Sequence, residues 1–255
     1  MEWYLDALRN DGQLLADTAA AGSLQTDVPP CPGWTVRDAV EHTAAVYQHK
    51  ISCMRLGRRP ESHEWPHAAD PDEEPVAWFR RSLGEVLGEL TERGPQAPSY
   101  TWWPADQTVG FWYRRMAQET AVHRVDVQSA FDQVSPVDPA LAVDGIDEVL
   151  KRFLGGDWSD LPEEEWAGID PQAGAGRAVA VRTGDNCWRV RMEPDRIDID
   201  IDIDTSTEPA DATVSGEPSE LLLWLWRRRP DTAVTLEGDN EAVAALRDRL
   251  YVATQ

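Results

Sequence analysis

The sequence predicts an α+β protein with a helical N-terminal domain, residues 1–155, and a smaller α+β C-terminal domain, residues 172–255. In the first part of the chain, apolar residues recur at helical spacing. Between Gly155 and Gly176 the composition shifts to Gly, Pro, Trp and acidic residues, which predicts a linker. The remainder alternates apolar and polar residues as strands do. A chain of 255 residues is long enough for each part to build a hydrophobic core.

Charge and cysteine content exclude several classes of protein. The chain has 24 Lys+Arg against 46 Asp+Glu, and this net charge of −22 argues against nucleic acid or an anionic membrane surface as the main partner. The sequence contains neither a membrane-spanning apolar run nor a signal-peptide pattern, so we expect a cytoplasmic protein. Cys31, Cys53 and Cys187 are widely separated, which predicts free thiols. The oligomeric state is not readable from these features.

The first helices are predicted from apolar spacing and from signals at the helix ends. The apolar residues of the first helix are Trp3, Leu5, Leu8, Leu14, Leu15 and Ala19. Gly22 is the expected stop of this helix. Thr35 and Asp38 fit the Ser/Thr-x-x-acid pattern of a capping box, so the second helix is expected to begin there. A long, proline-rich loop over residues 57–75 then precedes a third helix at about 76–93.

The C-terminal domain is predicted from a change in periodicity, after a fifth helix that follows Pro139. Strands are expected over residues 178–184, 187–193, 196–204, 211–216 and 233–238, and helices over 218–229 and 240–253. In RIDIDIDID, residues 196–204, isoleucines face one side of the strand and aspartates the other, which favours a solvated sheet face over a calcium loop. This row of like charges predicts that stability rises with salt, unless neighbours or cations compensate it.

The fourth helix, residues 110–131, carries two polar residues on its inward stripe. Glu119 and His123 are four residues apart and therefore lie side by side. On the second helix, His42 faces inward by the same spacing argument, and a helical bundle would bring the two stripes together. A buried carboxylate is costly unless it is paired or bound to a cation, and neutral imidazole is a common metal ligand. Convergence of His42, Glu119 and His123 therefore indicates a divalent metal site.

This ligand set leaves several chemistries open. Two histidines and one carboxylate form a zinc set with the fourth position open, and nickel, iron or manganese could use the same ligands. A metal in an open site can lower the pKa of a bound water or thiol and so make a nucleophile at neutral pH. The alternative without a metal is that the inward histidines are hydrogen-bonded core residues, because a Glu-x-x-x-His pair is frequent on helices.

Two motifs in the N-terminal half resemble the mycothiol-dependent maleylpyruvate isomerase family, within the wider DinB-like metalloenzymes. They are CPGWTVRDAVEH, residues 31–42, and FWYRRMAQETAVHRVD, residues 111–126. The stretch at 216–250 resembles the small α+β C-terminal domain of that family, so the resemblance covers nearly the whole chain. It implies a DinB-like four-helix bundle that holds a zinc ion through a His, a Glu and a His. By motif position these are His42, Glu119 and His123, the residues already reached from helical spacing.

The resemblance also implies a thiol cofactor and a class of reaction. The cofactor would be mycothiol, the low-molecular-weight thiol of actinobacteria, and the arginine-rich composition fits such a source. Its metal-activated sulfur would attack a small electrophilic substrate, which is then isomerised or S-conjugated. Two alternatives remain: a metal-dependent hydrolase that uses metal-bound water, and a non-catalytic protein that binds a metal or small ligand. Substrate identity is not encoded in any residue we recognise.

Arginines are the candidate contacts for a substrate carboxylate. Arg115 lies one turn before Glu119, near the predicted metal, although surface arginines without such a role are common. The resemblance implies that the C-terminal domain contributes an arginine, for which Arg227 and Arg228 are the candidates. Their alternative role is to complement the dipole at the end of the helix expected over residues 218–229.

Other polar and aromatic residues have both a functional and a structural interpretation. Asp38 could orient His42, although its role in the capping box is favoured, and Asp126 could accept the second N–H of His123 or be a solvated acid. Trp102, Trp103, Phe111 and Trp112 could line a pocket but are more typical of core. His49, His63 and His67 are not expected to be metal ligands.

Overall fold

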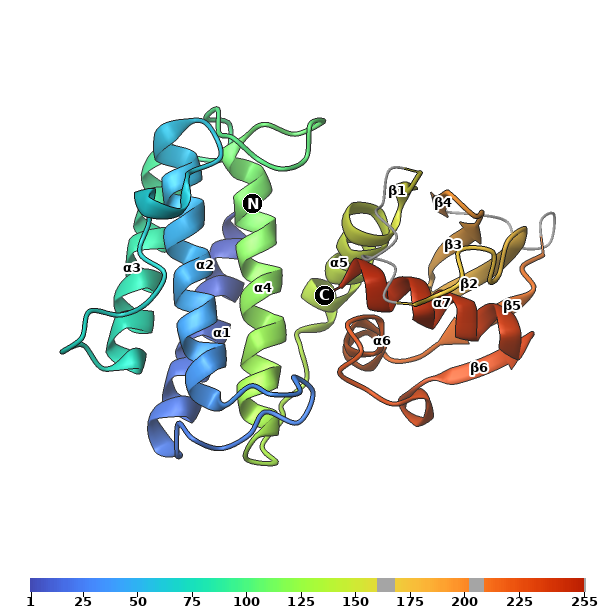
Figure 1. Cartoon of the computed structure of the whole chain (residues 1–255), viewed down its shortest axis with the longest axis horizontal. Coiled ribbons are helices and arrows are strands. Elements are labelled where there is room, and N and C mark those ends of the chain that lie inside the picture. The colour runs from blue at the N-terminus through green and yellow to red at the C-terminus, as the bar shows by residue number, and fades with distance from the viewer. Residues whose placement is uncertain (160–167, 202–208, 255) are drawn as a thin grey trace. The chain divides into compact units, whose positions relative to one another are not determined.

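The computed structural model describes residues 1–159, 168–201 and 209–254 and shows two compact units, Met1–Ser135 and Pro136–Gln255 (Figure 1). The first unit is helical and the second combines helices with a mixed six-stranded sheet, which confirms the predicted fold class. The helical domain was expected to extend to residue 155, but the division lies before the fifth helix. That helix, α5 (Pro139–Glu148), packs against α6 (Pro218–Leu225) through an apolar face and so belongs to the second unit.

Four long helices build the first unit, and its core lies between them. They are α1 (Glu2–Ala21), α2 (Val36–Leu56), α3 (Pro75–Arg93) and α4 (Val109–Ser129), with a short 3-10 turn, η1 (Ser62–Glu64), in the loop after α2. Helix α1 packs mainly against α4, and α2 packs against both α3 and α4. Leu8 and Leu15 of α1 are fully buried, whereas Trp3 and Leu14, expected on the same apolar face, are exposed.

The start of α2 is fixed by the predicted capping box. The Thr35 side chain accepts a hydrogen bond from the Asp38 backbone N–H, and Asp38 Oδ2 accepts one from the Thr35 backbone N–H at 2.7 Å. Asp38 is exposed, so capping is its observed role. Gly57 ends the helix with φ 66°, a left-handed conformation that suits glycine. These ends set which side chains of α2 face α4.

Helix α4 is buried over most of its length, with 18 of its 21 residues buried, so its polar side chains require partners. Arg124 Nε donates to Asp11 Oδ1 at 3.1 Å, and its Nη1 donates to Gln128 Oε1 at 2.8 Å. Between α2 and α4, Tyr47 Oη and Thr120 Oγ1 lie 2.5 Å apart, buried from solvent. Such a bond fixes the position of α2 relative to α4, because breaking it would leave a buried hydroxyl group without a hydrogen-bond partner.

The second unit is built on a sheet with strand order β1-β4-β3-β2-β5-β6, in which only β2 and β5 pair in parallel. The strands are β1 (Gly156–Asp157), β2 (Arg177–Thr183), β3 (Asn186–Met192), β4 (Arg196–Ile201), β5 (Ala212–Ser215) and β6 (Thr235–Gly238). The closing helix α7 (Asn240–Ala253) packs against β2 and β5, and a 3-10 turn, η4 (Asp231–Ala233), precedes β6. All five predicted strands are present in their described parts.

One expectation for this unit is corrected. The segment from Gly155 to Gly176 is not a linker between the units, because β1 within it pairs with β4, after a π-helical turn, η2 (Val149–Leu154), that continues α5. Within β4 the isoleucines differ in burial: Ile197 is buried and Ile201 is 47% exposed. The predicted end of this strand, residues 202–204, lies outside the described residues.

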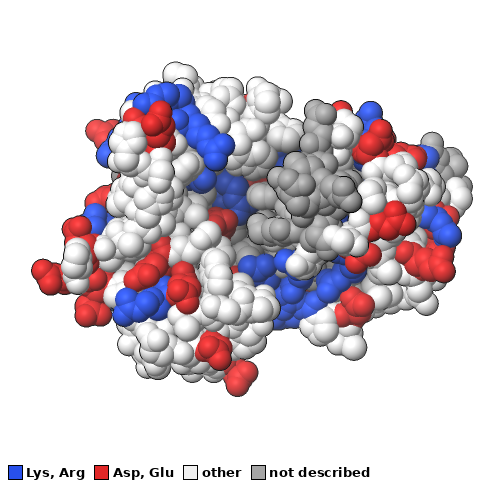
Figure 2. All heavy atoms as spheres, in the orientation of Figure 1, with Lys and Arg blue, Asp and Glu red and all other residues white. Residues whose placement is uncertain are grey.

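Charge is unevenly distributed over the molecule. On the face drawn in Figure 2, acidic side chains are scattered over both units, whereas Lys and Arg atoms gather in a few patches. No disulfide links Cys31, Cys53 or Cys187, as predicted. Among the described helices, none combines the length and apolar content that a membrane span requires.

Candidate metal centre

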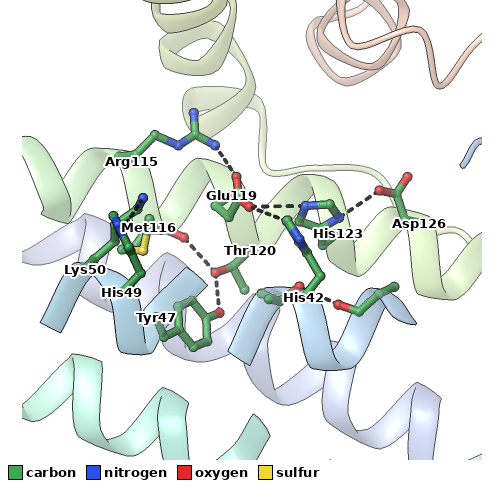
Figure 3. A network of polar contacts seen from close by, with 12 residues as sticks. His42, Tyr47, His49, Lys50, Arg115, Met116, Glu119, Thr120, His123 and Asp126 are labelled. Atoms are coloured by element: carbon green, nitrogen blue, oxygen red, sulfur yellow. Dashed lines mark hydrogen bonds and ion pairs between the residues drawn. The ribbon is translucent and has the colours of Figure 1, made fainter. Parts of the chain in front are cut away.

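The three predicted ligands converge at the contact between α2 and α4. His42 projects from α2, and Glu119 and His123 project from successive turns of α4 (Figure 3). Glu119 Oε1 lies 3.3 Å from His42 Nε2 and 3.2 Å from His123 Nε2. The side chains are graded in exposure, at 39% for His42, 17% for Glu119 and 9% for His123. The group therefore lies in the bundle with its His42 side open to solvent.

Glu119 is held between two imidazoles and a guanidinium. Arg115, one turn earlier on α4, donates from Nη2 to Glu119 Oε2 at 2.9 Å and is itself buried. Burial would raise the pKa of Glu119, but His123, His42 and Arg115 outweigh burial and hold that pKa well below its usual range. The carboxylate is therefore ionised, with Oε2 engaged by Arg115 and Oε1 turned toward both histidines.

His123 is oriented by a second carboxylate. Its Nδ1 lies 3.0 Å from Oδ2 of Asp126, which is completely buried. Burial would lower the pKa of His123, but Glu119 and Asp126 raise it to about 9. With Nδ1–H directed at Asp126, Nε2 points to the centre, the arrangement that fixes the tautomer of metal-binding histidines. Of the two interpretations of Asp126, the structure favours the one in which it contacts His123.

An indole covers both histidines. The ring centroid of Trp34 lies 4.9 Å from that of His42 and 6.0 Å from that of His123, with the second pair nearly parallel. Trp34 is positioned by a tight turn: its N–H donates to Cys31 O at 2.9 Å, and Gly33 adopts φ 85°, which favours glycine. The turn ahead of α2 thus restricts how far either imidazole can rotate.

The spacing of the three donor atoms fits one metal ion. Two ligands bound at about 2.05 Å in tetrahedral geometry lie about 3.3 Å apart. The two distances from Glu119 Oε1 match that value, and all three donor atoms lie within 4.8 Å of one another. A divalent ion would also offset the desolvation of the half-buried carboxylate. His42, Glu119 and His123 could therefore hold an ion and leave a position for a further ligand.

The predicted arginines are divided between the two units. Arg115 adjoins the trio, whereas Arg227 and Arg228 belong to the second unit and follow α6, which ends at Leu225, rather than lying in its last turn. Arg227 has φ 62°, lies 4.5 Å from the Tyr251 ring centroid, and donates from Nε to Thr254 Oγ1 at 3.3 Å. Arg228 donates from Nη1 to Trp226 O at 2.9 Å. A substrate contact by either residue stays a prediction.

The aromatic cluster and the remaining histidines are placed by the structure. Trp112 is buried, with Nε1 donating to Ser99 Oγ at 3.0 Å, whereas Trp102 is 38% exposed at the edge of the cluster. His49 is half-buried on α2 and does not belong to the group of three candidate ligands. His63 and His67 are exposed loop residues and also lie outside that group.

Two residues near the trio were not predicted from the sequence. Trp34 could have been suspected, because it stands directly before the capping box that positions His42. Lys50 lies two turns along α2 from His42, and its Nζ is 5.2 Å from the Trp112 ring centroid. The sequence feature that could have drawn attention to Lys50 is that the chain contains only two lysines.

Comparison with known proteins agrees with this architecture. Residues 5–128 match the family model described as the mycothiol maleylpyruvate isomerase N-terminal domain, and residues 140–245 match the C-terminal domain of the same family. Among solved structures, mycothiol-dependent maleylpyruvate isomerase matches with a TM-score of 0.58 at 13% identity, over 93% of each chain. A histidine-to-alanine mutant of that enzyme matches with a TM-score of 0.57 at 12% identity, also over 93% of each chain.

No curated protein sequence matches the chain significantly. At this level of identity, the solved structures establish the fold and not the activity. The two domain matches, in the same order along most of the chain, show that it belongs to the mycothiol maleylpyruvate isomerase family.

Proposed function

We propose that this protein is a metal- and thiol-dependent enzyme that isomerises or S-conjugates a small electrophile. The ion would be zinc or another divalent metal, and the thiol would be mycothiol. One observation carries the proposal: a carboxylate oxygen lies at the separation expected for ligands of a single ion from each of two imidazole Nε2 atoms, and all three donor atoms lie within 4.8 Å of one another. Membership of the family supports the thiol and the small-molecule substrate.

The protein's own residues prepare the centre for this chemistry. Arg115 holds Glu119 Oε2, so Oε1 is directed at the histidines. Asp126 accepts the Nδ1–H of His123, which directs Nε2 to the metal side and increases its basicity, and an ion that binds there would displace the Nε2 proton that the raised pKa implies. Trp34 limits rotation of both rings. Because these side chains are held before any ion binds, little reorganisation is needed when it does.

When bound, a divalent ion supplies a Lewis acid that lowers the pKa of a coordinated thiol or water to near neutrality. The exposed side of His42 leaves room for this further ligand. Arg115, and Arg227 or Arg228 from the second unit, are the candidates to orient a substrate carboxylate through a bidentate contact. Isomerisation would require the thiol to add to the double bond, rotation about the resulting single bond, and expulsion of the thiol as the double bond re-forms, whereas in S-conjugation the carbon–sulfur bond would remain.

Metal analysis combined with thiol titration tests this proposal. We expect about one divalent ion per chain, mycothiol binding that is abolished by a chelator, and turnover that depends on the thiol. His42→Ala and Glu119→Gln should lose the ion, whereas His63→Ala, which removes an exposed histidine of the loop, should retain it. If both site variants keep the ion, the ligand assignment is wrong. Thiol-independent hydrolysis would instead support a metal-bound water, and metal binding without turnover would support a binding protein.

A further inference from the structure

Lys50 carries an ammonium group on α2, two turns beyond the candidate ligand His42. Figure 3 labels this side chain together with that of its neighbour His49. The Nζ lies 3.1 Å from His49 Nδ1 and over the face of the Trp112 ring, 5.2 Å from its centroid. The residue as a whole is half-buried, so part of its surface is open to solvent.

The surroundings of Lys50 do not neutralise its charge. Among the described residues, its contacts are a neutral ring nitrogen and an aromatic face, and none is an ion pair with a carboxylate. Arg115 and Arg59 add positive charge nearby, while Glu119, a carboxylate whose charge acts on Lys50, is engaged by Arg115 and the histidines. A partly buried ammonium without a counter-charge is costly. Such a cost is typical of a site that receives an anion from solution.

The distance between Lys50 and the trio limits what this anion can be. Eight residues separate Lys50 from His42, which is about 12 Å along the axis of α2, and an extended lysine side chain spans about half of that distance. A ligand that reaches both the metal and the ammonium must therefore be several bonds long. Carboxylate is a strong charge-assisted acceptor for an ammonium, and a short organic acid satisfies both requirements.

We propose that Lys50 is the carboxylate subsite of the metal centre. The substrate would be a short organic acid whose carboxylate binds Lys50 Nζ while its electrophilic carbon lies at the metal-activated thiol. This inference deepens the proposed function and rests on it for the position of the thiol. It differs from the arginine candidates, because it assigns carboxylate recognition to a residue of α2.

Thiols that also carry a carboxylate mimic the adduct of the thiol with such an acid. The probes are ω-mercaptocarboxylates from mercaptopropionate to mercaptohexanoate, each paired with the ω-mercaptoalcohol of the same length. They are titrated into the full-length protein loaded with cobalt, in which thiolate coordination produces a charge-transfer band. We expect the best carboxylate to bind about tenfold tighter than its alcohol, the value for one hydrogen bond to a charged group.

Three variants test whether Lys50 causes this preference for the carboxylate over the alcohol. Lys50→Gln should bind acid and alcohol equally, with the affinity for the alcohol unchanged from wild type, and Lys50→Arg should retain most of the preference. The matched control is Lys151→Gln, which removes the only other lysine of the chain, one that is paired with Asp147 in the second unit. Persistence of the full preference in Lys50→Gln would overturn the proposal. Thermal unfolding of each variant reveals any misfolded protein before titration.

A failure of the proposed function gives a different result. If wild type shows no band with either kind of thiol, thiolate coordination is absent, whatever the role of Lys50. The subsite is then tested by calorimetric titration with glutarate against the neutral glutaramide. Binding of glutarate that is lost in Lys50→Gln and kept in Lys151→Gln supports the subsite. Equal binding of glutarate by both variants, or no binding by wild type, overturns it.

Discussion

Each candidate ligand is oriented by a residue that does not belong to the trio. Arg115 engages Glu119, Asp126 engages His123, and Trp34 covers both imidazoles. Buried groups of this kind hold a geometry because each one would lose a partner if the ligand moved. The affinity for a metal should therefore depend on residues that never touch it.

Asp126 provides a direct test of this dependence. Asp126→Asn should weaken metal binding by about 10- to 100-fold, because an amide neither fixes the His123 tautomer nor raises its basicity as a carboxylate does. Competition with a chromophoric chelator measures the affinity. Asp72→Asn, which neutralises an exposed acid of the loop before α3, should leave it unchanged. Equal affinities for Asp126→Asn and wild type would show that the contact at Nδ1 has no effect on binding.

His49 should titrate far below an ordinary histidine. Burial and the positive charges of Lys50, Arg59 and His67 lower its pKa to about 4. Because the unfolded state binds a proton near pH 6.5 and the folded state only near pH 4, this residue makes stability fall as pH drops through that window. NMR titration of the imidazole measures the pKa directly, and His49→Gln should reduce the loss of stability between those pH values. A pKa near 6.5 would contradict the burial of this ring.

The site was predictable from sequence where spacing along a helix determines it. Glu119 and His123 are four residues apart on one helix, so their adjacency follows from helical geometry alone. Lys50 was missed because its role depends on which group its long side chain reaches on another helix. The role of Asp126 could not be decided either, because the sequence does not show whether this carboxylate is buried against His123 or exposed to solvent.

At the level of elements, the capping box of α2 fixes where the helix begins and therefore the direction in which His42 projects. Thr35→Ala should lower the free energy of unfolding by about 1 kcal/mol, because a backbone N–H of the first turn loses its acceptor. Thr108→Ala is the matched control: Thr108 precedes α4 but makes no capping bond to it. Urea denaturation compares the two variants. A loss in Thr108→Ala as large as that in Thr35→Ala would mean that the cap is not the cause.

The acidic face of β4 is compensated by the neighbouring strand. Asp198 and Asp200 pair in register with Arg191 and Arg189 of β3, and Asp198 also accepts from Arg196 at 2.5 Å. Arg191→Gln should therefore destabilise the protein by about 0.5 kcal/mol at low salt. The loss should shrink in molar salt, where the Debye length is about 3 Å. Denaturation at both salt concentrations measures it, and a loss independent of salt would exclude a charge effect.

Periodicity predicted nearly every helix and strand but not the assignment of each to a unit. The apolar stripe of α5 is compatible with packing in either unit, so its contact with α6 could not be read from its own residues. Strand β1 was missed because two residues are too few to show alternation, and it forms only by pairing with β4. Both errors arise from contacts between residues distant in sequence.

At the scale of the whole molecule, all three candidate ligands lie in one unit. Metal binding should therefore stabilise Met1–Ser135, by about 4 kcal/mol when the free ion exceeds its dissociation constant a thousandfold. Hydrogen exchange with and without a chelator should show faster exchange in α2 and α4 of the metal-free protein. Strands β2 and β3 should change little. Glu119→Gln should abolish the response, and equal changes in both units would contradict a local effect.

The graded exposure of the trio has a kinetic consequence. His42, at 39% exposed, faces solvent, whereas His123, at 9%, anchors the inner side. An ion can thus be exchanged stepwise, with the outer imidazole released first, and no unfolding is required. Metal loading would then follow folding, at a rate limited by the hydrated ion rather than by the opening of the bundle. In a cell, the occupant would depend on which divalent ion is available after synthesis, since such ligands discriminate weakly among transition metals.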